Sequence, residues 1–163
     1  MDPYLAIASK RDERLYTDAP ISADVRGRIL DAGRLSGSSK NKQRWEFVVV
    51  SGEAKERLAE AVYAPENLRT AALVVAIVGE AGSFDSGRCA QNMMLAAWGD
   101  GVVSCPNGVR NADAAAAICG GDVRAILSFG RPARPRDAAG KSAEEWSARA
   151  NRKPLDELVR EID

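Results

Sequence analysis

Residues 37–44 combine side chains that hydrogen-bond polar ligands, and they lie directly before an apolar run. The segment contains two serines, an asparagine and a glutamine, and Trp45 leads from it towards the three valines at 48–50. A loop that only faces solvent does not need to lead into a buried strand. A loop that holds a polar ligand against a scaffold needs both the polar side chains and the buried strand. We therefore interpret residues 37–44 as a ligand-binding loop.

Ser39 and Lys42 within this loop also fit the S-x-x-K pattern, in which a lysine activates a serine nucleophile without histidine. The pattern is short, and the chain lacks the Ser-Asp-Asn and Lys-Thr-Gly motifs that complete the set. A second pattern, Gly140-Lys141-Ser142, resembles the end of a phosphate-binding P-loop but follows no predicted strand. A serine–lysine hydrolase is therefore a distant hypothesis, and the P-loop pattern is a chance match.

Two clusters of cationic side chains lie near opposite ends of the chain. Planar guanidinium groups suit a phosphate dianion, and two clusters that converge could hold one. A solvated charged face is the commoner outcome for such runs, so neither cluster is decisive alone. The first cluster is Lys10, Arg11 and Arg14, and the second is Arg149, Arg152 and Lys153.

A further candidate is the Pro106-Asn107-Gly108 sequence, which follows Cys105 at the end of a short predicted strand. These residue types favour an ordinary turn. The same turn can bring backbone N–H groups close to a ligand, because Gly108 has no side chain to obstruct the approach. Both interpretations stay open on these residues alone.

The chain contains no histidine, and this excludes several kinds of site. Hydrolases with a histidine base and metal sites with imidazole ligands each require that side chain. Cys89, Cys105 and Cys119 are widely spaced and form no CxxC pair, so we expect buried packing residues rather than a zinc site. If the protein is an enzyme, we expect a bound organic cofactor to carry the chemistry, with no catalytic side chain and no metal.

Composition indicates a single domain over residues 1–163. The chain is 45% hydrophobic and 28% charged, with 23 Lys plus Arg against 23 Asp plus Glu. This balance gives no field that would attract nucleic acid or a membrane surface. The longest apolar run, residues 71–79, is too short to span a bilayer, and the N-terminus lacks a signal-peptide layout, so we expect a cytoplasmic protein.

Hydrophobic periodicity predicts an α+β or α/β sandwich around one sheet. The strongest helix, residues 84–98, is apolar nearly all round, so we expect it at the centre of the protein or in a subunit interface. The predicted helices are 2–8, 23–35, 52–62, 84–98, 112–119 and 155–162. The predicted strands are 46–51 and 72–78, which are expected to be buried, together with 102–105 and 123–129. Residues 133–153 are expected to be extended or partly mobile.

Four segments in this order resemble the nitroreductase family of flavin enzymes, and together they span nearly the whole chain. The first is the basic segment at 10–14 with Tyr16 after it, and the second is the serine-rich loop with its strand. The third matches a D-x-G-x-x-x-Q-N-x-x-L-A-A-x-x-x-G helix, and the last combines a strand ending in G-x-P with a C-terminal R-K-P-L. The last two comprise Asp85, Gly87, Gln91, Asn92, Leu95, Ala96, Ala97, Gly99, Gly130, Pro132, Arg152, Lys153, Pro154 and Leu155.

The resemblance implies an α/β/α sandwich around a mainly antiparallel sheet, assembled as a domain-entwined homodimer with FMN at the subunit interface. The basic segments would hold the FMN phosphate, the serine-rich loop would reach the ribityl chain and ring from the partner subunit, and the turn at 106–108 would line the ring with a backbone N–H facing N5. Helix 84–98, centred on Met93 and Met94, would form the dimer core. The implied cofactor-binding residues are Lys10, Arg11, Asp12, Arg14, Ser38, Ser39, Asn41, Pro106, Asn107, Gly108, Arg152 and Lys153.

The activity that the resemblance implies is that of an FMN-dependent NAD(P)H oxidoreductase. NAD(P)H would give a hydride to flavin N5, and an oxidised acceptor such as a nitroaromatic or a quinone would then take the electrons. An alternative from a different class is a flavin-binding or carrier protein with little turnover.

The chain departs from the family pattern in several respects, one of which is Asn107-Gly108 in place of the more usual apolar and acidic pair. Asp12 stands where the family usually has a serine that donates to the phosphate, and a carboxylate repels a dianion unless Arg11 or Arg14 neutralises it. Gly37 and Arg44 replace two prolines that flank the serine-rich loop, which makes the loop less rigid. Only a few residues separate the third predicted helix from the following strand, where larger relatives carry helices over the flavin, so we expect a short member with an open active site.

Overall fold

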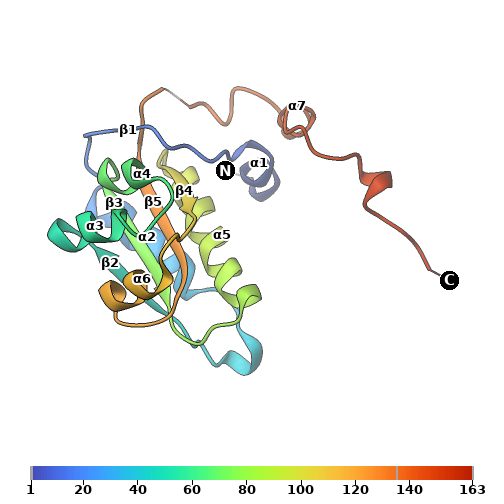
Figure 1. Cartoon of the computed structure of the whole chain (residues 1–163). Coiled ribbons are helices and arrows are strands. Elements are labelled where there is room, and N and C mark those ends of the chain that lie inside the picture. The colour runs from blue at the N-terminus through green and yellow to red at the C-terminus, as the bar shows by residue number, and fades with distance from the viewer. Residues whose placement is uncertain (1, 135, 163) are drawn as a thin grey trace. The chain divides into compact units, whose positions relative to one another are not determined.

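The computed structural model describes residues 2–134 and 136–162 (Figure 1). The chain divides into two compact units, and each is considered by itself. The larger unit is Arg11–Arg136, and the smaller unit combines Met1–Lys10 with Asp137–Asp163. The single domain expected from composition stays a prediction.

A five-stranded antiparallel sheet forms the middle layer of the larger unit. Its strands are β1 Tyr16–Thr17, β2 Glu46–Val50, β3 Leu73–Val78, β4 Val103–Asn107 and β5 Val123–Pro132. The order is β1-β5-β3-β2, and β4 also pairs with β5. The register places Val75 of β3 opposite Val49 of β2 and Leu127 of β5.

Helices cover both faces of this sheet, because successive side chains of a strand point to opposite faces. These helices are α2 Ala23–Arg34, α3 Gly52–Ala59, α4 Pro65–Arg69, α5 Ser83–Gly99 and α6 Ala112–Cys119. Leu73, Val75 and Ile77 of β3 share one core with α2 and α5, and the alternate residues of β3 share a second core with α3, α4 and α6. The arrangement confirms the predicted α/β/α sandwich.

Local sequence signals set the ends of two of these helices, as predicted. The Ser22 side chain caps α2 by accepting a hydrogen bond from the Val25 amide at 3.4 Å. The Asn111 side chain caps α6 by accepting one from the Ala114 amide at 3.1 Å. Gly120 ends α6 with φ 77°, a left-handed conformation that glycine adopts without strain.

The chain between α3 and β3 differs from the prediction. The helix was expected to reach residue 62, but α3 ends at Ala59, and Ala61 and Val62 donate backbone hydrogen bonds to carbonyls three residues back. Leu58, Ala61 and Val62 are buried as predicted. The short helix α4 then begins at Pro65, a residue type that suits the first turn of a helix. Both α4 and β1 are too short to give a periodic pattern, so neither was predicted.

β2 is less buried than predicted, because it ends the strand order and has only β3 beside it in the described sheet. Only Val50 of β2 is buried, and the residues before it are half-buried or exposed. β5 runs on to Pro132 rather than ending at 129. The ring of Tyr16 packs against its end, where a Cβ on Gly130 would lie 2.6 Å from Tyr16 Cγ.

The long helix α5 belongs to the core of its own chain. It contacts α2, β4 and β5, and its Met93 and Met94 are 0% and 7% exposed. Gly33 of α2 lets the helices approach closely, since a Cβ there would lie 2.2 Å from Met93 Cε. The side chains of Met93 and Met94 are thus already buried within the protomer, and a dimer core on α5 stays a prediction.

The smaller unit contains α1 Pro3–Ser9 and α7 Ala143–Ala148, which contact each other. The helix α7 lies in a segment that was predicted to be extended. Its start is fixed by reciprocal hydrogen bonds between Ser142 and Glu145, a capping box within a polar sequence. The predicted helix 2–8 is confirmed by α1.

The predicted helix 155–162 is wrong, since only a 3₁₀ turn, η2 Leu155–Glu157, forms there. Its apolar side chains are exposed in the structure, and a single amphipathic turn is unstable without a surface to pack on. These side chains are Leu155, Leu158, Val159 and Ile162.

Candidate functional site

The serine-rich loop, residues 37–44, has an unusual backbone. Its middle forms the 3₁₀ turn η1 Ser39–Asn41, and Lys40, Asn41 and Gln43 have φ of 53°, 53° and 48°. Left-handed residues other than glycine cost about 1–3 kcal/mol each and cluster at functional sites. Ser38 Oγ accepts a hydrogen bond from the Gln43 amide at 2.9 Å, which closes the loop, and the side chains of Ser39 and Asn41 are exposed.

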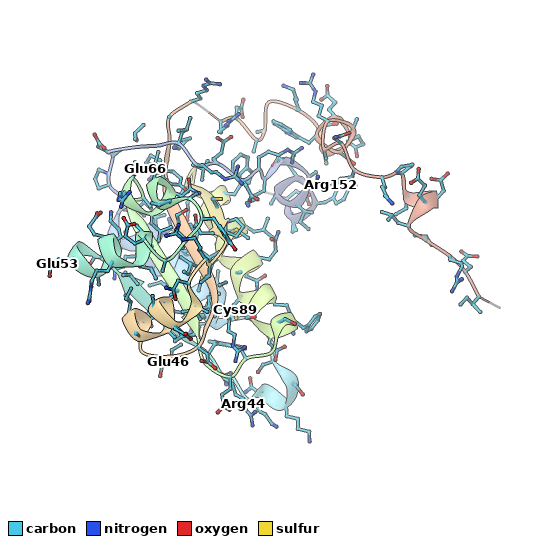
Figure 2. The ribbon with its side chains drawn as sticks, in the orientation of Figure 1. Arg44, Glu46, Glu53, Glu66, Cys89 and Arg152 are labelled. Atoms are coloured by element: carbon cyan, nitrogen blue, oxygen red, sulfur yellow. The ribbon has the colours of Figure 1, made fainter. Side chains whose placement is uncertain are left out.

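A cavity of about 170 Å³ lies between this loop and the start of α5. Both serines of the loop line it together with Lys42, and Asp85 of α5 lines the other side. Arg44, which is labelled in Figure 2, also lines the cavity, and its Nη1 pairs with Glu80 at 3.7 Å. Hydroxyl, cationic and carboxylate groups therefore meet here, which suits a ligand with both donors and acceptors.

Helix α5 fixes the start of the loop through two polar side chains. The guanidinium of Arg88 lies against Gly37, where a Cβ would be 2.6 Å from Nη2. The same guanidinium lies 5.6 Å from the centre of the Phe84 ring. Asn92 Nδ2 donates to the buried Ser36 Oγ at 2.8 Å. Arg88 therefore occupies the space that a side chain at position 37 would need.

The part of the basic segment that belongs to the larger unit lies beside β4. Asp12 forms an isolated parallel bridge with Ser104, and the Glu13 amide donates to the Ser104 carbonyl at 3.0 Å. Arg11 is half-buried, whereas Asp12 and Arg14 are exposed. The structure therefore brings these predicted phosphate-binding residues next to the strand that leads into the turn at 106–108.

The region where the basic segment meets β4 has two further features. Glu13 forms an ion pair with Arg136, which ties the basic segment to the region after β5. The hydroxyl of Ser104 is buried and has no hydrogen-bond partner among the described residues. A buried hydroxyl without a partner costs stability, so Ser104 is not optimised for the fold alone.

The turn predicted at 106–108 does not form, because these residues make the end of a strand, and we keep the turn at 106–108 only as the name of this strand end. Pro106 and Asn107 are the last residues of β4, and Gly108 follows them. Pro106 and Gly108 are exposed, whereas Asn107 is buried, and its amide donates to Ser128 Oγ at 3.0 Å. The side chain of Asn107 thus forms hydrogen bonds within the sheet, whereas Pro106 and Gly108 on either side of it are exposed.

Lys10, Arg152 and Lys153 belong to the smaller unit. Arg152 donates to the backbone carbonyl two residues before it at 3.2 Å, and both Arg152 and Lys153 are exposed (Figure 2). The convergence of these residues with Arg11 and Arg14 on one phosphate stays a prediction.

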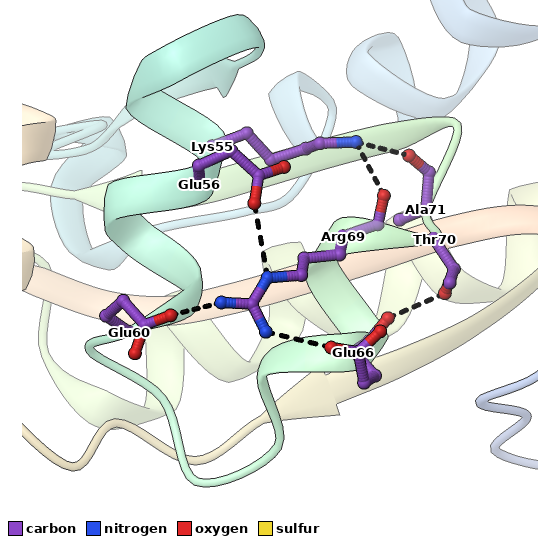
Figure 3. Close-up of polar contacts among 7 residues, drawn as sticks. All are labelled: Lys55, Glu56, Glu60, Glu66, Arg69, Thr70 and Ala71. Atoms are coloured by element: carbon purple, nitrogen blue, oxygen red, sulfur yellow. Dashed lines mark hydrogen bonds and ion pairs between the residues drawn. The ribbon is translucent and has the colours of Figure 1, made fainter.

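Sequence reasoning missed the α3–α4 corner, which we define as residues 55–71 (Figure 3). Arg69 Nη1 pairs with Glu66 at 2.8 Å and Nε pairs with Glu56 at 3.2 Å, and Nη2 pairs with Glu60. Lys55 Nζ donates to the backbone carbonyls of residues 69 and 71 at 2.9 and 3.2 Å. These contacts fasten α4 to α3 even though α4 is short.

Two buried polar residues were also missed, Asn67 of α4 and Ser128 of β5. Ser128 stands inside an apolar run, between Leu127 and Phe129, whereas Asn67 stands between the charged Glu66 and Leu68. A polar residue inside an otherwise buried run is the signal that the sequence offered for Ser128, because buried polar groups require partners.

Burial raises the pKa of the Tyr16 phenol and of the Cys89 and Cys119 thiols, so these thiols stay protonated and are weak nucleophiles. The three cysteines form no disulfide among the described residues, and all three are buried, as predicted. Within residues 2–134 and 136–162, no cluster of three acidic, cysteine or histidine side chains could hold a metal, and no helix is long and apolar enough to cross a membrane.

Comparison with known proteins shows a segment of one family within this fold. Residues 7–80, which include the serine-rich loop, match the model of the nitroreductase family. A Desulfovibrio desulfuricans protein described as a nitroreductase in complex with FMN has a TM-score of 0.80 and 25% identity, over 100% of this chain and 98% of that chain. This chain carries a nitroreductase-family segment in the nitroreductase fold.

Other nitroreductase-like proteins resemble the chain over different extents. The NADPH:FMN oxidoreductase of Vibrio harveyi, solved with NAD+, has a TM-score of 0.82 at 22% identity over 97% of this chain and 76% of that chain. The nitrobenzene nitroreductase of Ectopseudomonas oleovorans is 37% identical over 67 residues, which are 38% of this chain and 30% of that protein. The match thus spans less than a third of the curated relatives' length.

Proposed function

We propose that this chain is an FMN-dependent oxidoreductase that uses NAD(P)H to reduce an oxidised acceptor such as a nitroaromatic or a quinone. The observation that carries the proposal is the serine-rich loop, whose strained backbone leaves Ser39 and Asn41 exposed within the nitroreductase-family segment. The nitroreductase fold, and solved neighbours described with FMN and with NAD+, support the proposal.

The donor groups of this chain fit the three chemical parts of FMN. The hydroxyl of Ser39 and the amide of Asn41 suit the ribityl chain and the polar edge of the ring. The guanidinium groups of Arg11 and Arg14 suit the phosphate dianion. The turn at 106–108 has exposed residues on both sides of the buried Asn107, so its backbone is accessible to a flat ring.

The protein residues bind and orient, and none of them needs to act as an acid or a base. When bound, FMN supplies a ring that accepts a hydride from NAD(P)H and passes the electrons to the acceptor. Gly108 lacks a side chain, and the ring of Tyr63 already occupies the space that a Cβ there would take. Arg11 and Arg14 must offset the charge of Asp12 as well as that of the phosphate, which weakens phosphate binding relative to a serine at position 12.

We further infer that two copies of the chain complete the site, with the serine-rich loop of one copy facing the turn at 106–108 of the other. Beside the loop, Phe84 is 75% exposed and Leu35 is 66% exposed. Exposed large apolar side chains of this kind suit an interface between subunits. Light scattering on the purified protein tests the inference, and a monomer that binds FMN fully would contradict it.

Flavin binding and reduction test the proposed activity directly. We expect a yellow protein, or quenching of FMN fluorescence on titration, followed by bleaching of the flavin absorbance when NADH or NADPH is added anaerobically. Colourless protein that leaves FMN fluorescence unchanged would refute the proposal.

A flavin carrier with little turnover is the second candidate, and the carboxylate of Asp12 within the basic segment favours it. Tight FMN binding together with very slow bleaching by both nicotinamides would support the carrier. Rapid bleaching by either nicotinamide would exclude it.

A further inference from the structure

A buried pair of amide side chains joins α4 to the end of β4. Asn67 and Asn107 are 8% and 9% exposed, and Asn67 Nδ2 donates to Asn107 Oδ1 at 3.0 Å. Nothing in the periodicity of α4 requires a polar residue on this buried side. Asn107 directly precedes Gly108. It therefore lies within the turn at 106–108, to which the proposed function assigns the flavin ring.

Asn107 continues this contact across the sheet. Its Nδ2 donates to the Cys105 carbonyl and to Ser128 Oγ, both at 3.0 Å. Ser128 Oγ in turn lies 2.8 Å from the Tyr16 hydroxyl. One chain of hydrogen bonds therefore connects α4, β4, β5 and β1, and Asn67 is the member that comes from outside the sheet.

The α3–α4 corner also holds the turn from its far side. The Tyr63 amide donates to the Gly108 carbonyl at 3.0 Å, and the Arg110 amide donates to the Ala61 carbonyl at 2.8 Å. The ring of Tyr63 packs on Gly108, where a Cβ would lie 3.1 Å from Cδ2. Residues of the α3–α4 corner therefore form hydrogen bonds with the chain both before and after Gly108.

The Asn67–Asn107 pair restricts the orientation of the neighbouring backbone more than it stabilises the fold. Burying two amides gains little over two apolar side chains of the same shape, because each amide must first lose its water. A hydrogen bond fixes an angle as well as a distance, which apolar packing does not. The amide pair therefore constrains where the backbone at Pro106–Gly108 points.

We propose that Asn67 is a positioning residue, which acts through Asn107 to hold the turn at 106–108 in the geometry that receives the flavin ring. The inference rests on the proposed function for the identity of the ligand. Asn67 is buried and does not itself contact the ligand; it sets the geometry of a backbone that does.

Hydrogen–deuterium exchange on the flavin-free protein tests the first step. We expect Asn67→Ala to speed exchange of the Tyr63 and Arg110 amides by about tenfold, the effect of losing one buried hydrogen bond locally. Arg69→Gln is the matched control, because it removes the ion pairs of α4 with the three glutamates and keeps the Asn67–Asn107 bond. Equal exchange in Asn67→Ala and the parent protein would overturn the proposal.

The flavin-loaded protein tests the second step. We expect Asn67→Ala to weaken FMN binding about tenfold and to shift the midpoint potential by about 30 mV, the equivalent of a tenfold change in the preference for one oxidation state. Arg69→Gln lowers stability and should leave the potential unchanged. A faster-exchanging Asn67→Ala protein with unchanged potential and affinity would overturn the positioning role and leave the proposed function intact.

Two further outcomes are separable. A parent protein that binds no FMN would refute the proposed function and, with it, the role of Asn67 towards flavin. If Asn67→Ala does not fold, Asn67→Asp tests the same bond, since it keeps the shape but places an acceptor against Asn107 Oδ1. A folded Asn67→Asp protein with the potential and affinity of the parent would refute the proposal.

Discussion

Two glycines of α2 should respond in opposite directions to the same substitution. A Cβ added at Gly27 meets nothing within 4 Å, so Gly27→Ala should gain the helix propensity of alanine, about 1 kcal/mol of unfolding free energy. A Cβ at Gly33 would lie 2.2 Å from Met93 Cε and 2.9 Å from Phe47 Cζ. Overpacking of this kind costs about 1–3 kcal/mol, which exceeds the gain in propensity, so Gly33→Ala should lose about 1–2 kcal/mol net.

Urea denaturation followed by circular dichroism measures both changes. The midpoint should rise for Gly27→Ala and fall for Gly33→Ala with unchanged slopes, and each kcal/mol should move the melting temperature by about 2–4 °C. Because the two positions share one helix, differences in helix propensity alone would give the same sign. A raised midpoint for both variants would refute the reasoning, since it would mean that Met93 and Phe47 yield freely and that the α2–α5 contact is not tight.

Three other changes have definite expected outcomes. Replacing Arg14 and Arg152 together with alanine should weaken FMN binding by about tenfold or more, whereas Arg57→Ala on the outside of α3 should not, and an unchanged FMN titration would place the phosphate elsewhere. Ser104→Ala should raise the unfolding free energy by about 1 kcal/mol, because it removes a buried hydroxyl that lacks a described partner, and a lowered urea midpoint would contradict this. Burial raises the pKa of the Tyr16 phenol in the folded protein above its value in the unfolded chain. The stability that the neutral phenol contributes is therefore present below about pH 10 and is lost as the pH rises further. Tyr16→Phe should reduce the fall in urea midpoint between about pH 8 and about pH 10.5.

Elements with a long or well-capped pattern were predictable from sequence. β3 is apolar at every position, and α2 and α6 carry their caps in the sequence as Ser22, Asn111 and Gly120. The predictions failed where packing and capping, rather than the apolar pattern of the sequence, decide whether a helix forms. Residues 155–162 have a helical apolar stripe but nothing in the described structure to support it, and residues 143–148 form a helix through a capping box without an apolar stripe.

The candidate site shows a similar division. The serine-rich loop was predictable because hydroxyl and amide side chains precede a strand, and the exposure of Ser39 and Asn41 agrees with that interpretation. The buried destination of the Asn107 amide was not predictable, because Asn107 and Asn67 are forty residues apart and meet only through the fold. Their pairing depends on the tight turns after α3, which shorten that helix and start α4 at Pro65.

The amide pair has a consequence for how this sequence can diverge. Losing one member leaves the other with an unsatisfied buried group, which costs about 1–3 kcal/mol, whereas replacing both by apolar residues of similar shape approaches neutrality only if Ser128, which accepts from Asn107, changes as well. Descendants of this chain should therefore carry both Asn67 and Asn107 or neither. The two positions form one inherited unit, and a lineage that abandons it must pass through a weakened intermediate before the turn at 106–108 can adopt a new geometry.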